Sequence, residues 1–309
     1  MANSTVKVSV ITLMYNTGKE VVETIRSVHE DSYPNLVHDI FDDCSTDDSV
    51  KRVSDYIQDR GLQSVLHENA YNLGINENKK KALNTVEGEL ILGLSDDLLY
   101  PGRVWSDVQL YSELKEHERD NLFGFFGPVE MFDTMTGETT QILDPFPELD
   151  QTTVITNDQM ARLLLKKNVI PAISVTLIKS SVDRVEKPKG FFIEDYPLWV
   201  NAVLEGFDFL YRPFIATRYR QTAKSVQITR MAEVVRDKFY CKKLLLAHDS
   251  ISVDLGQQEL WRTYFNNILN FDSGERKLII KLLFNEDLRI MNALKGFISF
   301  AKGFAKRHF

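Results

Sequence analysis

The fold is decided by residues 6–48, which read VKVSVITLMYNTGKEVVETIRSVHEDSYPNLVHDIFDDCSTDD. Val6–Met14 is a β-branched apolar run typical of a buried strand, and Lys19–His29 then changes to the spacing of an amphipathic helix. Val37–Phe41 predicts a second strand, and Ser45–Asp48 after it has the composition of a helix N-cap. Strand, helix, strand and helix in this order predict a βαβ unit, in which the strands run parallel.

The same alternation continues to about residue 100. Ser64–His67 and Glu89–Leu94 predict two more strands, and Ile75–Val86 predicts a helix between them. The helix that begins after Asp48 carries its apolar residues on one face: Val50, Val53, Tyr56 and Ile57. We therefore expect an α/β fold with a mostly parallel central sheet flanked by helices on both faces.

The remainder of the chain divides into a mixed part and a helical part. The mixed part predicts a helix after Pro101, an aromatic strand at Leu122–Phe132, a loop at Asp133–Asp150, a helix at Asn157–Lys167 and a strand at Ile173–Ile178. The helical part predicts helices at Met231–Ala247, Gln257–Phe271 and Lys277–Lys306, with breaks near Gly256 and Gly274. The change in pattern predicts a domain boundary near residue 226.

Composition and charge exclude several classes of protein. A net charge of -7 argues against a nucleic-acid partner, which usually leaves a basic footprint. Cys44 and Cys241 lack metal-ligand spacing, so we expect no disulfide framework and a reducing compartment. We find neither a signal-peptide pattern nor a run of about 18 apolar residues. These features predict a cytoplasmic protein, one that can touch the cytoplasmic face of the inner membrane.

Acidic pairs recur where strands and turns are expected to end. They are Asp42-Asp43, Asp47-Asp48, Asp96-Asp97 and Glu194-Asp195. Each pair by itself is more simply a solvated turn, because aspartate favours turns and helix caps. However, ligands of open parallel sheets bind outside the carboxyl ends of the strands, and adjacent carboxylates repel each other unless a cation or donors compensate. Several pairs at one predicted edge therefore favour a binding site.

Asp96-Asp97 is the pair best suited to a metal ion. Carboxylate oxygens are ligands for Mg²⁺ or Mn²⁺, which commonly bridge to substrate phosphates. No Cys or His cluster suits zinc, and no glycine-rich phosphate loop occurs. Lys79, Lys80 and Lys81 form a basic run near the expected edge, and we expect at least two of them on a solvated helix face.

Short motifs occur in a fixed order along the chain. They are VSVITLMYN at 8–16, SYPN at 32–35, DDCSTD at 42–47, NLG at 72–74, SDD at 95–97, GFFIEDYPLWVNAVLEGFDFLY at 190–211 and RYR at 218–220. This ordered set resembles family 2 nucleotide-sugar glycosyltransferases of the GT-A fold, among them those of bacterial surface-polysaccharide assembly. The resemblance covers about residues 6–225. It implies a catalytic domain at 1–225, with a Rossmann-like nucleotide half at about 1–100 and an acceptor half at about 101–225. A helical C-terminal extension at 226–309 follows.

The resemblance also implies roles for particular residues. Thr12 and Tyr15 would line the nucleotide base, and Tyr15 would stack on it, since a strand end favours exposure over core packing. Asp43, or less favourably Asp42, would accept a hydrogen bond from the uracil imide of a UDP-sugar. Lys79 stands where arginine is usual, and keeps the charge but loses the bidentate fork. The full donor set is Thr12, Tyr15, Asp42, Asp43, Lys79, Ser95, Arg220 and Lys224.

For catalysis, the resemblance implies an inverting displacement that requires a divalent metal, Mn²⁺ or Mg²⁺. Asp96, with Asp97, would hold the metal, and Asp195 would be the general base. Glu194 would raise the pKa of Asp195 through like charge, unless it is only a solvent-facing neighbour. Trp199 would stack on an acceptor sugar, with core packing as an equal alternative. The product would be a hexosyl- or N-acetylhexosaminyl-transferase acting on a glycan or lipid-linked acceptor.

Two departures from the family pattern keep alternatives open. Leu94 stands in place of the first aspartate of the family's Asp-x-Asp-Asp motif, and Ser95 can replace only part of the ribose contact of that aspartate. Thr222 stands where a histidine is frequent in the family. Leu94 favours a catalytically decayed nucleotide-sugar-binding protein. A sugar-phosphate nucleotidyltransferase would instead need a basic, glycine-rich loop after the first strand, and Thr12–Lys19 supplies none.

The C-terminal residues 286–309 combine an apolar face with basic side chains. The apolar positions at helical spacing are Ile290, Leu294, Phe297, Ile298, Ala301 and Phe304. The basic positions are Lys295, Lys302, Lys306 and Arg307. Such a helix can bind an anionic membrane interface peripherally, or it can pack on the catalytic domain or in a homo-oligomer.

Overall fold

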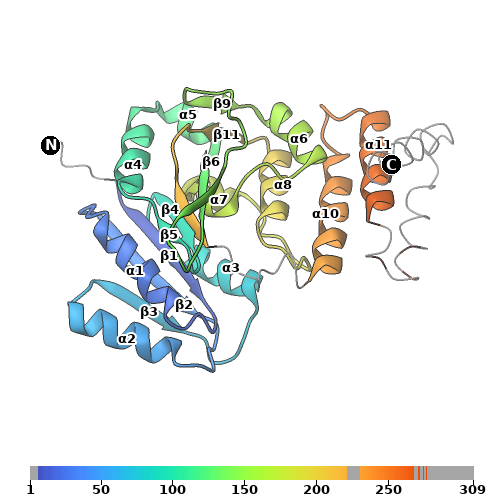
Figure 1. Cartoon of the computed structure of the whole chain (residues 1–309). Coiled ribbons are helices and arrows are strands. Elements are labelled where there is room, and N and C mark those ends of the chain that lie inside the picture. The colour runs from blue at the N-terminus through green and yellow to red at the C-terminus, as the bar shows by residue number, and fades with distance from the viewer. Residues whose placement is uncertain (1–5, 221–229, 268–270, 272–273, 275, 277–309) are drawn as a thin grey trace. The chain divides into compact units, whose positions relative to one another are not determined.

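The structure is a computed structural model, and it describes residues 6–220, 230–267, 271, 274 and 276 of the 309-residue chain (Figure 1). The chain folds into two compact units that interleave along the sequence. The first comprises Met1–Thr156, Ile170–Lys189 and Gly206–Thr222, and the second Asn157–Val169, Gly190–Glu205 and Ala223–Phe309. The expected domain boundary at residue 225 stays a prediction.

The first unit is built on a mixed sheet in the order β3-β2-β1-β4-β10-β6-β11-β9. The strands are β1 (Val8–Met14), β2 (Leu36–Asp42), β3 (Ser64–Glu68), β4 (Leu90–Leu94), β6 (Leu122–Phe126), β9 (Thr153–Ile155), β10 (Thr176–Ile178) and β11 (Asp208–Tyr211). The neighbours from β3 to β4 pair parallel, and so do β6 and β11. Strand β10 pairs antiparallel with β4 and with β6, and β9 pairs antiparallel with β11. The α/β class with a central sheet flanked by helices is thus confirmed.

Helices flank this sheet, and four of them were predicted from the apolar patterns: α1 (Glu20–Glu30), α2 (Ser49–Arg60), α3 (Ile75–Thr85) and α4 (Arg103–Glu113). The short helices α5 (Glu116–Asn121) and α7 (Lys179–Arg184) were not predicted. Val28 of α1 and Val104 of α4 pack with Val8 and Leu90 of the sheet, and all four are 0% exposed. Burial of each such side chain contributes about 1.5–3 kcal/mol. The apolar face of α2 packs on α1 through Val53, as expected.

A smaller sheet in the order β5-β12-β7-β8 lies in the same unit. Its strands are β5 (Leu98–Leu99), β7 (Val129–Phe132), β8 (Thr139–Leu143) and β12 (Thr217–Arg220). The prediction that residues 133–150 form only a loop is wrong, because Thr139–Leu143 pairs with β7 as a strand. Its five residues are all exposed, so the strand carries no pattern of burial that a sequence could reveal.

Helices are the main elements described in the second unit. Its helices are α6 (Asn157–Lys166), α8 (Tyr196–Leu204), α10 (Met231–Leu245) and α11 (Val253–Asn266). The predicted break near Gly256 is wrong, because Gly256 lies inside α11, where it packs closely on Leu246. None of the helices described combines the length and the apolar character needed to cross a membrane. Residues 286–309, with their expected amphipathic helix, lie outside the described residues.

Candidate active site

The segments that follow β1, β2 and β4 meet at one edge of the larger sheet. In the parallel register Met14 lies beside Asp42, and Thr12 lies beside Leu94. The backbone N–H of Asp43 donates to the carbonyl of Met14 at 2.8 Å, and the Ser95 hydroxyl donates to the carbonyl of Leu13 at 3.2 Å. Tyr15, Asp43 and Asp96-Asp97 are therefore brought to the same carboxyl edge, as the alternating pattern predicted.

Asp43 is 3% exposed and organises the loop that leads into α3. Its Oδ1 accepts hydrogen bonds from Asn69 Nδ2 at 3.0 Å and from the N–H of Leu73 at 2.7 Å, and its Oδ2 accepts from the N–H of Gly74 at 2.8 Å. A carboxylate offers about four acceptor positions, so one further donor can still be accommodated. The contact of Asp43 with a uracil imide stays a prediction.

The loops after β1 and β2 are tied together by Asn16, which has a positive φ of 51°. Its side-chain Oδ1 accepts from the N–H of Thr46 at 2.8 Å, and its own N–H donates to Ser45 Oγ at 2.9 Å. Asp42 is only 2% exposed, and its Oδ2 accepts a hydrogen bond from the N–H of Ser45 at 3.0 Å. Asp42 thus stabilises the loop after β2.

Tyr15, beside Asn16, is 49% exposed, so the core-packing alternative is wrong for this ring.

Thr12 does not reach this exposed edge with its side chain. Its hydroxyl is fully buried and hydrogen-bonds Nε2 of His38 across the strand pair at 2.9 Å. Burial, and secondly the charge of His29, lower the pKa of His38 to about 3. The prediction that Thr12 lines the nucleotide base is therefore wrong for its side chain, which stabilises the sheet instead.

Asp96 and Asp97 are two carboxyl groups at this edge whose pKa values are raised. Asp97 is 2% exposed; burial, and secondly the charge of Asp96, raise its pKa to about 7. Burial also raises the pKa of Asp96. Asp97 Oδ1 accepts from the N–H of Arg220 at 2.9 Å, and Arg220 Nε donates to the Asp96 carbonyl. The Arg220 guanidinium also forms an ion pair with Glu23 at 2.6 Å. The contact of Arg220 with a diphosphate stays a prediction.

The basic residues expected near the donor differ in their surroundings. Lys81 Nζ donates to Asn69 Oδ1 at 2.6 Å and Lys80 pairs with Glu77 at 3.1 Å, so these two lysines stabilise α3 and its neighbourhood. Lys79 is half-buried on the same helix, and its donor role stays a prediction. Lys224 lies outside the described residues.

The expected catalytic base lies in the second unit, directly before α8. Asp195 occupies the N-cap position of α8, and its Oδ2 accepts from Asn168 Nδ2 at 3.0 Å. Glu194 precedes it in an irregular segment. Trp199 is 1% exposed among the buried residues of α8, so the prediction that it stacks on an acceptor sugar is wrong and core packing is observed.

Several residues that shape these loops carried no local signal. Asn16, Asn69 and Asn168 form hydrogen bonds with partners 26 to 31 positions away in the sequence, and Asp237 with partners 44 and 45 positions away. A polar side chain in a loop or on a helix is ordinarily solvated. Only the fold reveals that these four have internal partners.

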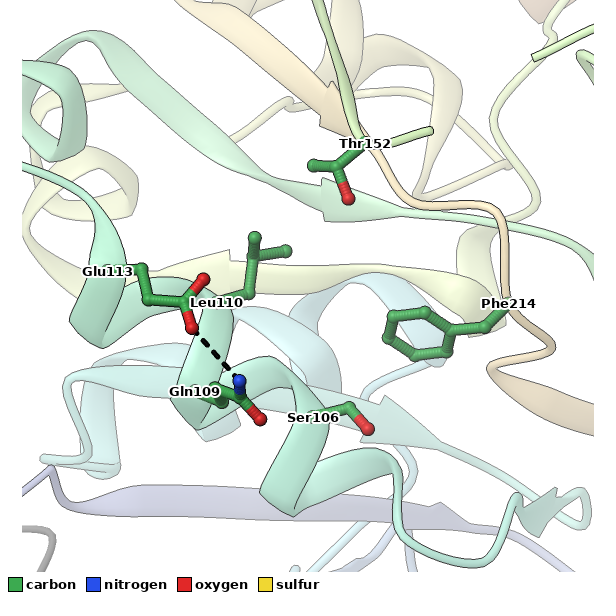
Figure 2. Close-up of a pocket in the computed structure, with 6 residues that line it drawn as sticks. All are labelled: Ser106, Gln109, Leu110, Glu113, Thr152 and Phe214. Atoms are coloured by element: carbon green, nitrogen blue, oxygen red, sulfur yellow. Dashed lines mark hydrogen bonds between the residues drawn. The ribbon is translucent and has the colours of Figure 1, made fainter. Parts of the chain in front are cut away.

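A pocket of about 240 Å³ lies elsewhere on the first unit (Figure 2). Figure 2 shows Gln109, Leu110 and Glu113 on α4, with Thr152 and Phe214 across from them. Ser106 completes the lining, and Gln109 Nε2 donates to Glu113 Oε1 at 2.9 Å. None of the site residues expected from the sequence is among these six.

The sheet, its tied loops and the buried acids at its carboxyl edge define an α/β protein with a candidate ligand site where its parallel strands end. Residues 9–168 match the family model described as glycosyl transferase family 2, which is just over half of the chain. The chain belongs to this family and is a glycosyltransferase. The nucleotidyltransferase alternative is thereby set aside.

Relatives with sequence similarity are bacterial. TuaG of Bacillus subtilis (strain 168), named as a teichuronic acid biosynthesis glycosyltransferase, is 25% identical over 80% of this chain and 92% of its own. The UDP-Glc:alpha-D-GlcNAc-diphosphoundecaprenol beta-1,3-glucosyltransferase WfaP of Escherichia coli is 25% identical over 79% and 89%. A crystal structure of S. aureus TarS 1-349 in complex with UDP-GlcNAc has a TM-score of 0.59 at 16% identity, covering 95% of this chain and 80% of that one. At this identity the structural likeness shows the fold alone.

Proposed function

We propose that this protein is an inverting transferase that moves a sugar from a UDP-sugar to a glycan or lipid-linked acceptor in bacterial surface-polysaccharide synthesis. The observation that carries the proposal is the pair of half-buried Asp96 and buried Asp97 just after β4, both with raised pKa values, in a chain of glycosyl transferase family 2. WfaP, whose name includes a diphosphoundecaprenol acceptor, supports a lipid-linked acceptor. TarS binds UDP-GlcNAc and supports the uridine donor.

The two carboxyl groups fit a divalent cation. Both pKa values are raised by burial, so a bound cation would favour the ionised forms that the protein interior disfavours. Within the described residues, no group of three or more His, Cys, Asp or Glu is placed to hold a metal. Two carboxylates are nevertheless sufficient when substrate phosphates complete the coordination. When bound, Mn²⁺ or Mg²⁺ would supply positive charge against the departing diphosphate.

The chain's own residues would perform the remaining steps. Asp43 and Tyr15 would bind the nucleotide through the uracil edge and the base face. The Asp195 carboxylate would accept the proton of the acceptor hydroxyl while that oxygen bonds to the anomeric carbon. The bond from the anomeric carbon to the diphosphate oxygen breaks at the same time, so the configuration inverts.

A panel of nucleotide sugars, incubated with Mn²⁺ and lipid-linked acceptors, tests this function. We expect one UDP-sugar to be consumed and its sugar to appear on an acceptor by mass spectrometry. UDP binding without transfer or hydrolysis of any donor would instead support the catalytically decayed protein that Leu94 suggests. Consumption of a GDP- or TDP-sugar alone would overturn the uridine assignment.

A lipid-linked acceptor would require access to a membrane. We propose that the basic, apolar-faced residues 286–309 provide it peripherally at the cytoplasmic face of the inner membrane. The alternative is that these residues pack on the catalytic domain or in a homo-oligomer, and binding to anionic liposomes distinguishes it from the membrane proposal.

A further inference from the structure

The segment Gly190–Asp195, which carries the proposed base, has no regular secondary structure. A catalytic group on such a segment needs support, because displacement by about 1 Å can cost about 100-fold in rate. Side chains from two other helical regions of the same unit provide contacts to it, one to its backbone and one to Asp195 itself.

The first contact comes from Asp237 on α10. Asp237 is 1% exposed, and its Oδ2 accepts hydrogen bonds from the N–H of Phe192 and, at 2.9 Å, from the N–H of Ile193. Arg230, at the start of α10, lies 4.8 Å from the ring centroid of Phe192. Burial raises the pKa of Asp237, and the two backbone donors oppose that shift. Burial of a carboxyl group costs free energy unless the group is hydrogen-bonded. The hydrogen bonds to the backbone of Phe192 and Ile193 therefore explain why Asp237 can be buried here.

The second contact comes from Asn168, just beyond the end of α6. Its Nδ2 donates to Asp195 Oδ2 at 3.0 Å. The end of α6 is itself anchored, since Lys242 Nζ on α10 donates to the carbonyl of Lys166 at 3.0 Å. The Tyr196 hydroxyl, one residue beyond Asp195, donates to the carbonyl of Leu164 on α6. The carboxylate is thus fixed relative to both α6 and α10.

We propose that Asp237 and Asn168 are positioning residues for Asp195, an inference that rests on the proposed function. Asp237 fixes the path of the segment, and Asn168 fixes the orientation of the carboxylate. The N–H that Asn168 donates also favours the ionised form of Asp195, which is the form able to accept a proton. Asn168 and Asp237 would therefore act on the reaction through Asp195, without touching the substrate themselves.

Single variants test both contacts. Asn168→Ala and Asp237→Ala should lower kcat about 10- to 100-fold while the KM for the UDP-sugar changes less than about 2-fold. Asn168→Ala should also move the acid limb of kcat/KM to higher pH, because the ionised carboxylate loses a donor. Asp237→Asn should keep most of the activity, since both backbone donors share one oxygen that an amide oxygen can replace.

Matched controls are Asn266→Ala on α11 and Asp249→Asn after α10, both at exposed positions, and neither should change kcat or the pH profile. A purely structural role of Asn168 is excluded by combining it with Asp195→Asn. If Asn168 acts only through Asp195, adding Asn168→Ala to Asp195→Asn should lower kcat no further. Melting temperatures identify any variant that fails to fold.

The outcomes separate this inference from the proposed function. If Asp195→Asn abolishes transfer but folded Asn168→Ala keeps parental kcat and pH profile, the positioning inference is wrong and the function stands. A further loss of kcat when Asn168→Ala is added to Asp195→Asn also overturns it. If Asp195→Asn itself transfers sugar at the parental rate, the base assignment fails, and with it this inference.

Discussion

Replacing Asp107 by asparagine should destabilise the first unit more than any exposed charge change. Asp107 on α4 is 0% exposed and lies between two buried guanidinium groups. Arg212 Nε is 2.8 Å from Asp107 Oδ1, and Arg103 Nε is 3.5 Å from Oδ2. Burial lowers the pKa of Arg103 to about 9, which still leaves it charged at neutral pH.

The magnitude follows from the geometry. Asp107→Asn keeps the shape of the side chain and an oxygen that can accept from the Thr176 hydroxyl, but it removes the charge between two buried cations. Removing one partner of a buried ion pair typically costs about 3–5 kcal/mol. That is a large share of the about 5–15 kcal/mol that holds a typical protein folded. Arg103 also donates to Thr217 Oγ1 at 2.6 Å, so the loss should loosen the start of β12.

Urea unfolding followed by circular dichroism measures the free energy of unfolding of each variant. The matched control is Asp55→Asn, which removes an exposed partner of Lys51 on α2 and should change stability far less. A loss below about 1 kcal/mol for Asp107→Asn would show that the two guanidinium groups do not depend on this carboxylate, and would refute the reasoning.

The remaining predictions concern chemistry, metal, pH and membrane. Asp195→Asn should keep fold and UDP binding while lowering turnover about 10²–10⁴-fold; transfer within about tenfold of the parent would remove it as the base. Asp96→Ala should weaken Mn²⁺-dependent binding of UDP more than binding of uridine in calorimetry, and an unchanged UDP affinity after EDTA would contradict the metal site. Because the pKa of His38 is about 3 in the fold and 6.5 is its ordinary value, His38 is protonated at a higher pH in the unfolded chain than in the folded protein. Stability should therefore be full above pH 6.5 and fall by up to about 5 kcal/mol as the pH drops toward 3, and His38→Gln should flatten that slope. Truncation after Asn285 should abolish sedimentation with anionic liposomes at low salt while leaving soluble-acceptor activity intact; a lower melting temperature or a changed oligomer would indicate packing instead.

The sequence predicted the strands that form the site because each contains β-branched or large apolar residues between turn-like segments. Val6–Met14, Val37–Phe41 and Glu89–Leu94 each match an observed strand within one or two residues. Thr139–Leu143 was not predicted, since it is exposed throughout and only its pairing with β7 makes it a strand. The sequence predicted a helix from Gln257 with a break near Gly256, because glycine usually weakens a helix; α11 instead begins at Val253, and Gly256 inside it permits close contact with Leu246.

At the site, the sequence predicted which acids gather but could not predict what each one does. Asp43 and Asp97 were expected to face ligands, and the fold shows Asp43 binding three protein donors and Asp97 binding the backbone of Arg220. Thr12 and Trp199 were expected at ligand surfaces and are buried instead. Exposure is a property of the packed chain, so spacing alone cannot assign it.

The sequence by itself determined the α/β class, the positions of the parallel strands along the chain and the placement of Asp42-Asp43 and Asp96-Asp97 where strands end. These follow from local periodicity, which depends on residues a few positions apart. Only the tertiary structure decided the raised pKa of Asp97 and the support of Asp195 by Asn168. It also decided the contact of Asp237 with the base segment. The physical reason is that desolvation and hydrogen bonding depend on groups far apart in the chain, which become neighbours only when the chain has folded.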